Sequence, residues 1–492
     1  MKKISDFLKK YKMLLCLFLG CSILFHFVLF THDLLTADVL LNNHYYDGYA
    51  WELSLGRFGL YIFGLIKGFY VFKNIEIFLS MLLFAISSIL IIDLFKIKNK
   101  VIRVLLVILI SISPILSSTY LFYYCTLPYS FSFCCGVLAI YLYYNSKKRL
   151  FKFFIPIILI IMLLSCYQAY LAIPCTLFIL VTIKNLFEHK FTWKDTFLCI
   201  VVILLGLILY FILMKLVLLI FSIPMSSYRS ANQLGFNTIL EIPKRVLLSY
   251  IEFFNYYFRD SIVNNHNQFL HISNIILLIL LILGTVWKFV KEKLSFKEIL
   301  LILISLMLLP LGINIITVLL GEELQLLMSS GYLLILYYLG YILEDNKLFI
   351  ILGSILFIFM IRGYLIQVNA SYEVLNNTYL KTERMAVNIL NDFEKSNCKQ
   401  LMISGDITEV DSYSNYEDDN TYGFISTYPL FWSEYSNLSN GWERFMKYYL
   451  GSDIEFVDEA TYNKILDNKS YKKIKSYPSS SVIDDVFVIK FE

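Results

Sequence analysis

A short polar segment after the first apolar run carries residue types suited to acid–base and phosphate chemistry. It runs through His44, Asp47 and Glu52 and ends in the tripeptide Gly56-Arg57-Phe58. Desolvating a carboxylate near a bilayer costs free energy, so acidic groups at such positions are functional candidates. A carboxylate followed closely by an arginine suits a lipid-phosphate substrate at the membrane surface.

Asp47 is the first candidate for a general base that takes a proton from an attacking hydroxyl group. It lies just before an apolar stretch expected at the membrane surface, where a lipid phosphate would reach it. The alternative is that Asp47 only caps that helix. Asp38 is the second candidate for the base, with the same alternative. His44 and Glu52 are candidates for contacting the substrate.

Three arginines are candidates for binding the phosphate of a donor, namely Arg57, Arg229 and Arg362. The alternative for Arg57 and for Arg362, which lies near the end of the last apolar run, is that the side chain snorkels to lipid headgroups. The alternative for Arg229 is an ordinary solvated surface position. Basic groups in this role would stabilise the negative charge of a departing phosphate.

A second polar feature is the pair Tyr167-Gln168, which lies at a short turn between two apolar runs. The two side chains suit hydrogen bonding to sugar hydroxyls. Alternatively, they satisfy the backbone of a tight turn inside lipid, where no water is available.

The cysteines and histidines do not form a pattern typical of metal binding. Eight of the nine cysteines lie in apolar runs, no Cys-x-x-Cys occurs, and the six histidines are scattered. We therefore predict neither a disulfide framework nor a dedicated metal site. No cofactor is certain from the sequence, and a divalent cation is left open.

The composition is that of an integral membrane protein. Of the 492 residues, 58% are hydrophobic and 16% are charged, whereas a soluble domain is about half apolar and about a quarter charged. The first apolar run is too long for a cleavable signal core and reads as a signal anchor. Hydropathy predicts about eleven spans, at residues 12–31, 75–95, 101–118, 121–144, 153–167, 170–185, 197–221, 271–290, 298–319, 326–344 and 347–366.

Basic residues predict the orientation of these spans. Lysines and arginines gather before the first span and after the second, fourth, sixth and eighth, whereas the intervening short loops carry none. By the positive-inside rule the basic loops are cytoplasmic. The N-terminus is then on the cytoplasmic side of a plasma membrane, and an odd number of spans places the C-terminal tail outside.

The sequence divides into a multi-span domain at 1–367 and an extracytoplasmic α/β domain at 368–492. Two long outer loops are expected at 32–74 and 222–270, each with a helix lying along the membrane, at 49–72 and 239–259. In the tail, residues 400–404, 453–457 and 486–491 are predicted strands, and 383–395 and 442–449 are predicted helices.

This layout resembles the GtrII-type glucosyltransferase family, membrane enzymes associated with glucosylation of surface polysaccharide. The resemblance rests on the acidic first outer loop ending in Gly56-Arg57-Phe58, the turn with Tyr167-Gln168, the many-span body and the α/β tail. It implies a polytopic α-helical membrane protein of the GT-C glycosyltransferase class that transfers a hexose with inversion.

The resemblance also implies the substrates and partners. The donor would be undecaprenyl-phosphate glucose, supplied by a separate synthase and flippase. The acceptor would be a cell-surface glycan such as O-antigen, wall polysaccharide or teichoic acid, and no nucleic-acid partner is expected. Long outer loops agree with an external site, because an enzyme using a nucleotide sugar would need a cytosolic domain and no predicted inner segment is large enough.

Three other functions are compatible with such a chain. A transporter or flippase of lipid-linked glycans is one, but transporters usually carry polar residues in mid-span, whereas here the spans are nearly uncharged. A polysaccharide polymerase would also favour large outer loops. A non-catalytic surface adhesion or assembly protein would use the tail.

Overall fold

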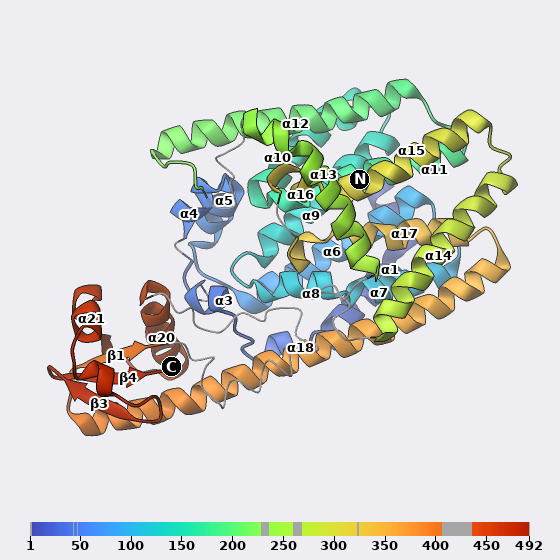
Figure 1. The fold of residues 1–492 in the computed structure, drawn as a ribbon. Helices are drawn as coiled ribbons and strands as arrows, with labels where there is room; N and C mark the ends of the chain where they lie inside the picture. Colours follow the sequence, from blue (N-terminus) through green and yellow to red (C-terminus); the bar gives the residue numbers. More distant parts are fainter. Residues whose placement is uncertain are drawn as a thin grey trace. The chain divides into compact units, whose positions relative to one another are not determined.

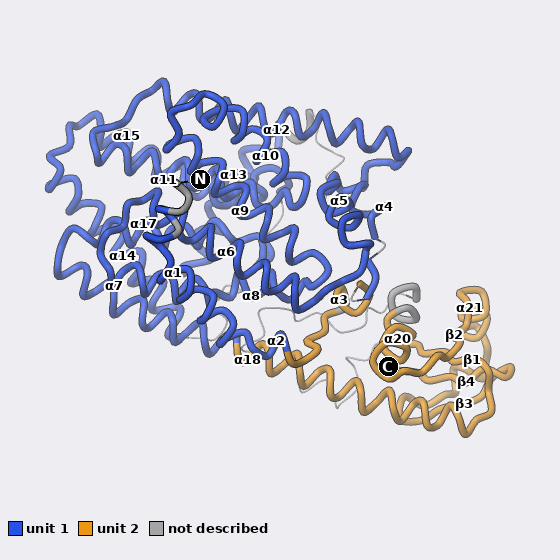
Figure 2. Tube along the Cα trace, turned by 180° about the vertical axis from the view of Figure 1, so that it is seen from behind, with its two compact units in different colours: residues 1–30, 44–368 blue, residues 31–43, 369–492 orange. Residues whose placement is uncertain are grey.

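The computed structural model describes residues 2–42, 44–46, 48–227, 236–258, 268–321, 324–405 and 435–491. These residues form two compact units: one of residues 1–30 and 44–368, and one of residues 31–43 and 369–492 (Figure 2). We call them the helical unit and the sheet unit. The division falls within the long C-terminal helix, and the sheet unit also includes residues 31–43. The domain boundaries expected from the sequence stay predictions.

Helices account for nearly all regular structure of the helical unit (Figure 1). They begin with α1 (Lys2–Phe25), α2 (Val28–Thr31), α4 (Tyr49–Ser54), α5 (Phe58–Lys67), α6 (Lys73–Phe95), α7 (Lys100–Ser111), α8 (Pro114–Leu121), α9 (Thr126–Asn145), η1 (Leu150–Phe154) and α10 (Ile155–Cys166). They continue with η2 (Gln168–Leu171), α11 (Ala172–Phe187), α12 (Trp193–Phe221), α13 (Phe236–Phe258), α14 (Gln268–Lys291), α15 (Phe296–Ile313), α16 (Ile315–Leu320), η4 (Leu326–Met328), α17 (Gly331–Leu343) and α18 (Lys347–Ser396).

Eight helices of the described chain are long and apolar enough to cross a bilayer, at Lys73–Phe95, Lys100–Leu121, Thr126–Asn145, Gln168–Phe187, Trp193–Phe221, Phe269–Lys291, Phe296–Ile313 and Lys347–Ser396. Each corresponds to one predicted span, which makes this a helical polytopic membrane protein. The other three predicted spans, 12–31, 153–167 and 326–344, are occupied by α1–α2, η1–α10 and η4–α17. The total of about eleven stays a prediction.

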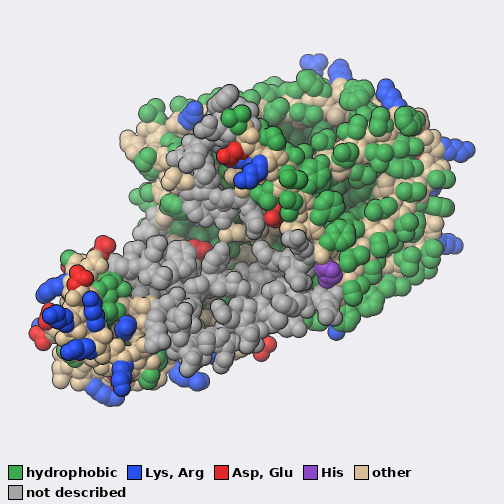
Figure 3. Space-filling model, in the orientation of Figure 1, with side chains coloured by type: hydrophobic (Ala, Val, Ile, Leu, Met, Phe, Trp, Pro, Cys, Tyr) green, Lys and Arg blue, Asp and Glu red, His purple; other side chains and the backbone are tan. Residues whose placement is uncertain are grey.

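The apolar helices differ in how much of their surface the protein itself covers. The most apolar stretches of α6, α7–α8, α9 and η2–α11 are 67–83% buried, whereas those of α12, α14, α15 and α18 are only 28–39% buried. Hydrophobic side chains accordingly cover most of the visible face of the helical unit (Figure 3). An exposed apolar surface of this extent requires lipid rather than water around it.

At one end of the helical unit, ion pairs between charged side chains link neighbouring helices. Ion pairs link Lys10 to Asp93 at 2.8 Å, Lys96 to Glu188 at 3.2 Å, Lys152 to Asp195 at 2.8 Å, His189 to Glu298 at 2.8 Å and Lys288 to Asp345 at 2.6 Å. Lys10 lies within α1 and Lys152 in η1, and the other partners lie at or beside the ends of α6, α11, α12, α14, α15 and α17. We call this the lysine-rich end, and the opposite termini of the same helices form the other end.

Two predictions about helix boundaries were wrong. The apolar stretch 49–72 is not one helix but two, α4 and α5, because Gly56 between them has a positive φ of 80°. The helix predicted at 383–395 is the last part of α18, which continues unbroken from the final apolar stretch. Residues 367–382 contain neither glycine nor proline, and their Val368, Tyr372 and Leu375 are buried, so nothing there ends the helix.

The sheet unit contains a four-stranded sheet in the order β2-β1-β4-β3. The central strand β1 pairs in parallel with β2 and β4, and β3 pairs antiparallel with β4. β3 was not predicted, because it has only four residues and two of them are serine. The elements are α3 (Ala37–Asn42), β1 (Gln400–Ser404), α20 (Tyr435–Tyr449), β2 (Glu455–Phe456), α21 (Glu459–Leu466), η6 (Tyr471–Lys473), β3 (Ser480–Ile483) and β4 (Val486–Lys490).

Gly405, directly after β1, offers a test of the packing of this sheet. Its φ is +86°, and a Cβ atom there would lie 1.9 Å from the backbone oxygen of Phe491. We expect Gly405→Ala to destabilise the sheet unit by several kcal/mol, because left-handed strain of about 1–2 kcal/mol adds to the backbone overlap. Thermal melting and protease sensitivity of the purified protein measure the effect.

Gly451→Ala is the matched control, since Gly451 also has a positive φ, +68°, but no atom within 4 Å of the added Cβ. It should show only the conformational strain of about 1–2 kcal/mol. Equal melting temperatures for the two variants would contradict the packing around β1.

Candidate functional site

A buried ion pair lies between α4 and α5, at the end of the helical unit opposite the lysine-rich end. The Arg57 Nη1 atom lies 3.3 Å from Oε2 of Glu52, and their side chains are 18% and 4% exposed. The backbone closes the same turn, because the Arg57 amide donates to the Glu52 carbonyl at 2.8 Å. Burying two charges is costly unless each is paired and hydrogen-bonded, so their other partners decide what the site is.

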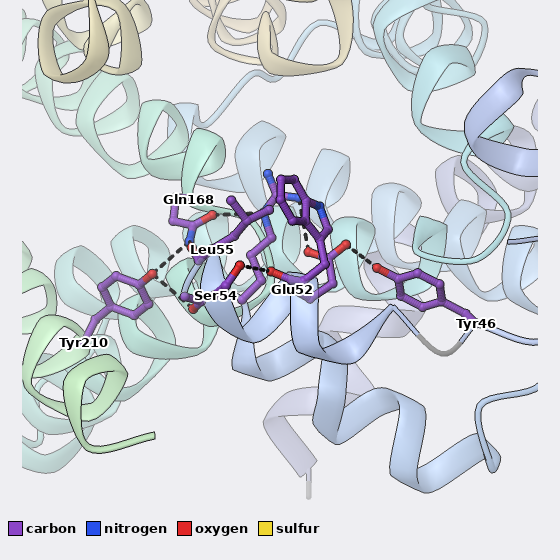
Figure 4. Close-up of polar contacts among 9 residues, drawn as sticks. Tyr46, Glu52, Ser54, Leu55, Gln168 and Tyr210 are labelled. Atoms are coloured by element: carbon purple, nitrogen blue, oxygen red, sulfur yellow. Dashed lines mark hydrogen bonds and ion pairs between the residues drawn. The ribbon is translucent and has the colours of Figure 1, made fainter. Parts of the chain in front are cut away.

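Glu52 has partners on both carboxylate oxygens. Oε2 accepts from Arg57, and Oε1 accepts from the hydroxyl of Tyr46 (Figure 4). Burial and the neighbouring Glu52 carboxylate raise the pKa of Tyr46 well above its ordinary value, so its hydroxyl stays a donor. A carboxylate engaged on both oxygens is suited to orienting the guanidinium beside it.

Arg57 is oriented from its other side by Gln168. The Arg57 Nε atom donates to Oε1 of Gln168 at 3.3 Å, and the Arg57 guanidinium lies 5.3 Å from the ring centre of Tyr167. Tyr167 in turn stacks on Tyr129 with ring centres 4.1 Å apart. Burial opposes the charged form of Arg57, but Tyr129, Glu52 and Tyr167 together hold its pKa well above the ordinary value.

Gln168 is held in one orientation by two further hydrogen bonds. Its Nε2 donates to the Leu55 carbonyl at 2.7 Å and to the Tyr210 hydroxyl at 2.8 Å, and Tyr210 donates to the Gly56 carbonyl at 3.1 Å. Figure 4 shows Gln168 beside Leu55 and Tyr210, with Glu52 reaching toward Tyr46 on the other side. We call Tyr46, Glu52, Arg57, Tyr167, Gln168 and Tyr210 the Arg57 cluster.

Gly56 is required for this geometry. In addition to its positive φ, a Cβ atom at Gly56 would lie 2.6 Å from the Met214 sulfur and 2.6 Å from the Tyr210 hydroxyl. The turn before Arg57 therefore packs directly on α12, and only glycine fits there.

The structure brings together four of the residues predicted from sequence: Glu52, Arg57, Tyr167 and Gln168. His44 belongs to the same unit, but it is exposed and its carbonyl accepts from the Val71 amide at 3.2 Å. Arg362 lies on α18 with its guanidinium 4.4 Å from the ring centre of Phe269. Their roles stay predictions.

The predicted bases are placed differently. Asp47 lies outside the described residues, between the described Tyr46 and Gly48, and so does Arg229. Asp38 lies in the first turn of α3, in the sheet unit. Their roles stay predictions too.

Sequence reasoning missed Tyr46, Tyr129 and Tyr210 as members or supports of the site. Tyr129 and Tyr210 lie inside apolar helices of a chain with 37 tyrosines, so nothing local distinguishes them. Tyr46 adjoins Asp47 in the polar segment, and that position was the one available signal. Within the described ranges no group of three or more His, Cys, Asp or Glu side chains is placed to hold a metal ion.

The fold and the cluster define a helical membrane protein with a buried, oriented cation at one end of its helices. The chain belongs to the family described as glucosyl transferase GtrII, whose model matches residues 27–343. It is therefore a glucosyltransferase, as the resemblance implied. No curated protein matches the chain, and no solved structure matches it.

Gln168→Leu tests how far the cluster depends on its amide. We expect a loss of glucosyl transfer of at least about tenfold together with a stability loss of about 1–3 kcal/mol, because the buried Leu55 carbonyl and Arg57 Nε lose their partner. Transfer rate and melting temperature of the purified protein are the measurements.

The control for this prediction is Gln400→Leu, which removes an exposed hydrogen bond to Glu455 in the sheet unit. It should change neither quantity appreciably. A Gln168→Leu protein with wild-type transfer would show that the orientation of Arg57 does not matter for catalysis.

Proposed function

We propose that this glucosyltransferase takes glucose from a polyprenyl-phosphate carrier on the outer face of a bacterial plasma membrane and attaches it to a cell-surface polysaccharide. The observation that carries the proposal is the Glu52–Arg57 pair, fixed by Gln168, at the end of the helices opposite the lysine-rich end. Lysine-rich ends of membrane helices are cytoplasmic by the positive-inside rule. The Arg57 cluster then faces the outside.

Arg57 supports a phosphate-bearing donor in particular. Its guanidinium uses Nε for Gln168 and one Nη1 hydrogen for Glu52. Among the described residues, Nη2 has no hydrogen-bond partner, so a fork of donors is available to a ligand. Guanidinium groups bind phosphate through such forks.

The apolar surroundings support a lipid carrier. The helix α5, which begins directly after Arg57, has the sequence FGLYIFGLIK, and its Ile62, Leu65 and Ile66 are exposed. A short helix of this kind suits the membrane interface. A phosphate attached to a polyprenyl chain would enter at this level, whereas a water-soluble nucleotide sugar would have no need of it.

The reaction consistent with this arrangement is a direct displacement with inversion at the sugar. The acceptor hydroxyl oxygen forms a bond to C1 of glucose, the bond between C1 and the phosphate oxygen breaks, and the phosphate keeps the electron pair. Asp47 takes the acceptor proton, with Asp38 as the second candidate. Arg57 stabilises the departing phosphate. Glu52 holds Arg57 rather than taking the proton, because both carboxylate oxygens of Glu52 already accept hydrogen bonds.

The substrates imply further partners. A separate synthase would make the lipid-linked glucose from a nucleotide sugar inside the cell, and a flippase would carry it across the membrane. The acceptor class we propose is a surface glycan such as O-antigen, wall polysaccharide or teichoic acid, with the sugar hydroxyl as the attacking group.

Asp47→Asn tests the proposed base. We expect kcat for transfer from polyprenyl-phosphate glucose to fall by about 10²–10⁴-fold, because the amide cannot accept the proton. Purified protein with radiolabelled lipid donor and surface glycan gives the rate. In the same assay, Asp38→Asn should reduce kcat much less. Asp485→Asn, at an exposed position, is the neutral control.

One result would reassign the base, and another would contradict the proposed function. Full activity in Asp47→Asn together with a large loss in Asp38→Asn would move the base to Asp38. Absence of transfer by the wild-type protein, combined with movement of intact lipid-linked sugar across vesicles, would favour a flippase.

The orientation has its own test by cysteine labelling in intact cells. Tyr70→Cys, between α5 and α6, should react with a membrane-impermeant maleimide, whereas Lys147→Cys, between α9 and η1, should react only after permeabilisation. Both positions are exposed, and Cys398→Ser removes the native cysteine of the sheet unit. The reverse labelling pattern would place the Arg57 cluster in the cytosol and end the proposal.

A further inference from the structure

A second buried ion pair lies beside the Arg57 cluster and has no role so far. Lys67, the last residue of α5, places its Nζ atom 2.8 Å and 3.0 Å from the two oxygens of Glu76 in the first turn of α6. The two side chains are 12% and 3% exposed. Neither residue was a candidate from the sequence.

The ammonium group of Lys67 has three hydrogens and three acceptors. The third acceptor is the Tyr124 carbonyl at 3.1 Å. Glu76 has a further donor, because the Phe72 amide donates to its Oε1 at 3.1 Å. The carboxylate thus keeps a hydrogen bond even when Lys67 turns away, whereas a lysine side chain is flexible enough to change partners.

The pair adjoins the Arg57 cluster through Tyr124. The ring of Tyr124 packs on Tyr46 with centres 4.7 Å apart, and Tyr46 donates to Glu52. The backbone carbonyl of the same Tyr124 accepts from Lys67. Tyr124 therefore contacts Lys67 through its carbonyl and the Arg57 cluster through its ring.

The proposed reaction changes the charge of the phosphate. The donor is a phosphodiester with one negative charge, and the product is a phosphate monoester whose second ionisation has a pKa of about 6. As the C1–O bond breaks, one unit of negative charge develops on the phosphate. A group that binds only this additional charge accelerates the reaction, since it favours the transition state over the bound donor.

We propose that Lys67 is a second cation of the donor site, which turns from Glu76 to the phosphate as the sugar departs. Arg57 matches the single charge of the donor, and Lys67 matches the charge that appears during transfer. Glu76 holds Lys67 in place beforehand and lowers its affinity for the singly charged donor. This inference rests on the proposed lipid-phosphate donor and names a further catalytic residue for it.

The alternative is that the pair has only a structural role and holds α5 against α6. The two ideas differ in what Lys67→Gln and Glu76→Gln should do. If the pair is only structural, Lys67→Gln and Glu76→Gln should reduce activity equally, because both break the same pair. If Lys67 binds the phosphate, only Lys67→Gln should reduce activity, because Glu76→Gln keeps the positive charge of Lys67 and removes its partner.

The experiment measures two quantities: inhibition by the product polyprenyl monophosphate, and the KM for the donor polyprenyl-phosphate glucose. Both are measured at about pH 5.5 and at about pH 8, because these values lie on either side of the second pKa of the phosphate. In the wild type, inhibition should tighten as pH rises, because the product gains its second charge. Lys67→Gln should abolish this tightening and lower kcat by about 10²-fold, with KM changed by less than about threefold. Glu76→Gln should keep the tightening.

Two further variants guard against trivial loss of folding. The double variant Lys67→Gln/Glu76→Gln leaves no unpaired buried charge and should behave as Lys67→Gln does. Lys288→Gln/Asp345→Asn removes a comparable buried pair at the lysine-rich end and should leave the pH dependence of inhibition intact. Melting temperatures of all variants identify those that fold.

The inference is overturned if folded Lys67→Gln or the double variant shows wild-type product inhibition at both pH values. It is also overturned if Lys67→Gln and Glu76→Gln are equally impaired, which is the structural result. If instead the wild type transfers no glucose from the lipid donor, the proposed function itself fails, so the two failures are distinguishable.

Discussion

The Arg57–Glu52 ion pair is the interaction on which the rest of the site depends. Two charges with 18% and 4% exposed side chains are stabilised by each other and by the hydrogen bonds from Tyr46 to Glu52 and from Arg57 to Gln168. Gln168 is in turn fixed by Leu55 and Tyr210. The turn between these two short helices is thereby held against η2 and α12, and among the described residues Arg57 Nη2 has no hydrogen-bond partner.

This arrangement separates two kinds of charge between the two ends of the helical unit. At one end, lysines pair with acids across helix termini, mostly in half-exposed positions, although Lys288 and Asp345 are more buried. At the other end, the pairs Glu52–Arg57 and Lys67–Glu76 are buried among aromatic rings. Half-exposed pairs contribute little energy, whereas a buried cation interacts strongly with an anion that reaches it. That contrast is why the second end is the candidate site of a glucosyltransferase.

The sequence predicted the elements well where the signal is local. The eight long apolar helices, the amphipathic helix at α13 and the strands β1 and β4 were all located from hydropathy and alternation. Errors arose where a local rule competes with packing. A change of composition after residue 367 indicated a boundary, but buried Val368, Tyr372 and Leu375 carry α18 through it. The break at Gly56 depends on Met214 and Tyr210, 154 or more residues away in sequence.

By itself, the sequence determined that this is a polytopic membrane protein with basic loops on one side, and it singled out Arg57, Glu52 and Gln168 as polar groups in an apolar chain. Only the tertiary structure decided that these three meet, that Tyr210 orients the amide, and that Lys67 and Glu76 lie next to them. Hydropathy and charge are local properties, and they can be read directly from the order of residues along the chain. A hydrogen bond between residues 111 positions apart, as in Arg57–Gln168, depends on which helices pack together, and single-residue patterns do not encode that choice.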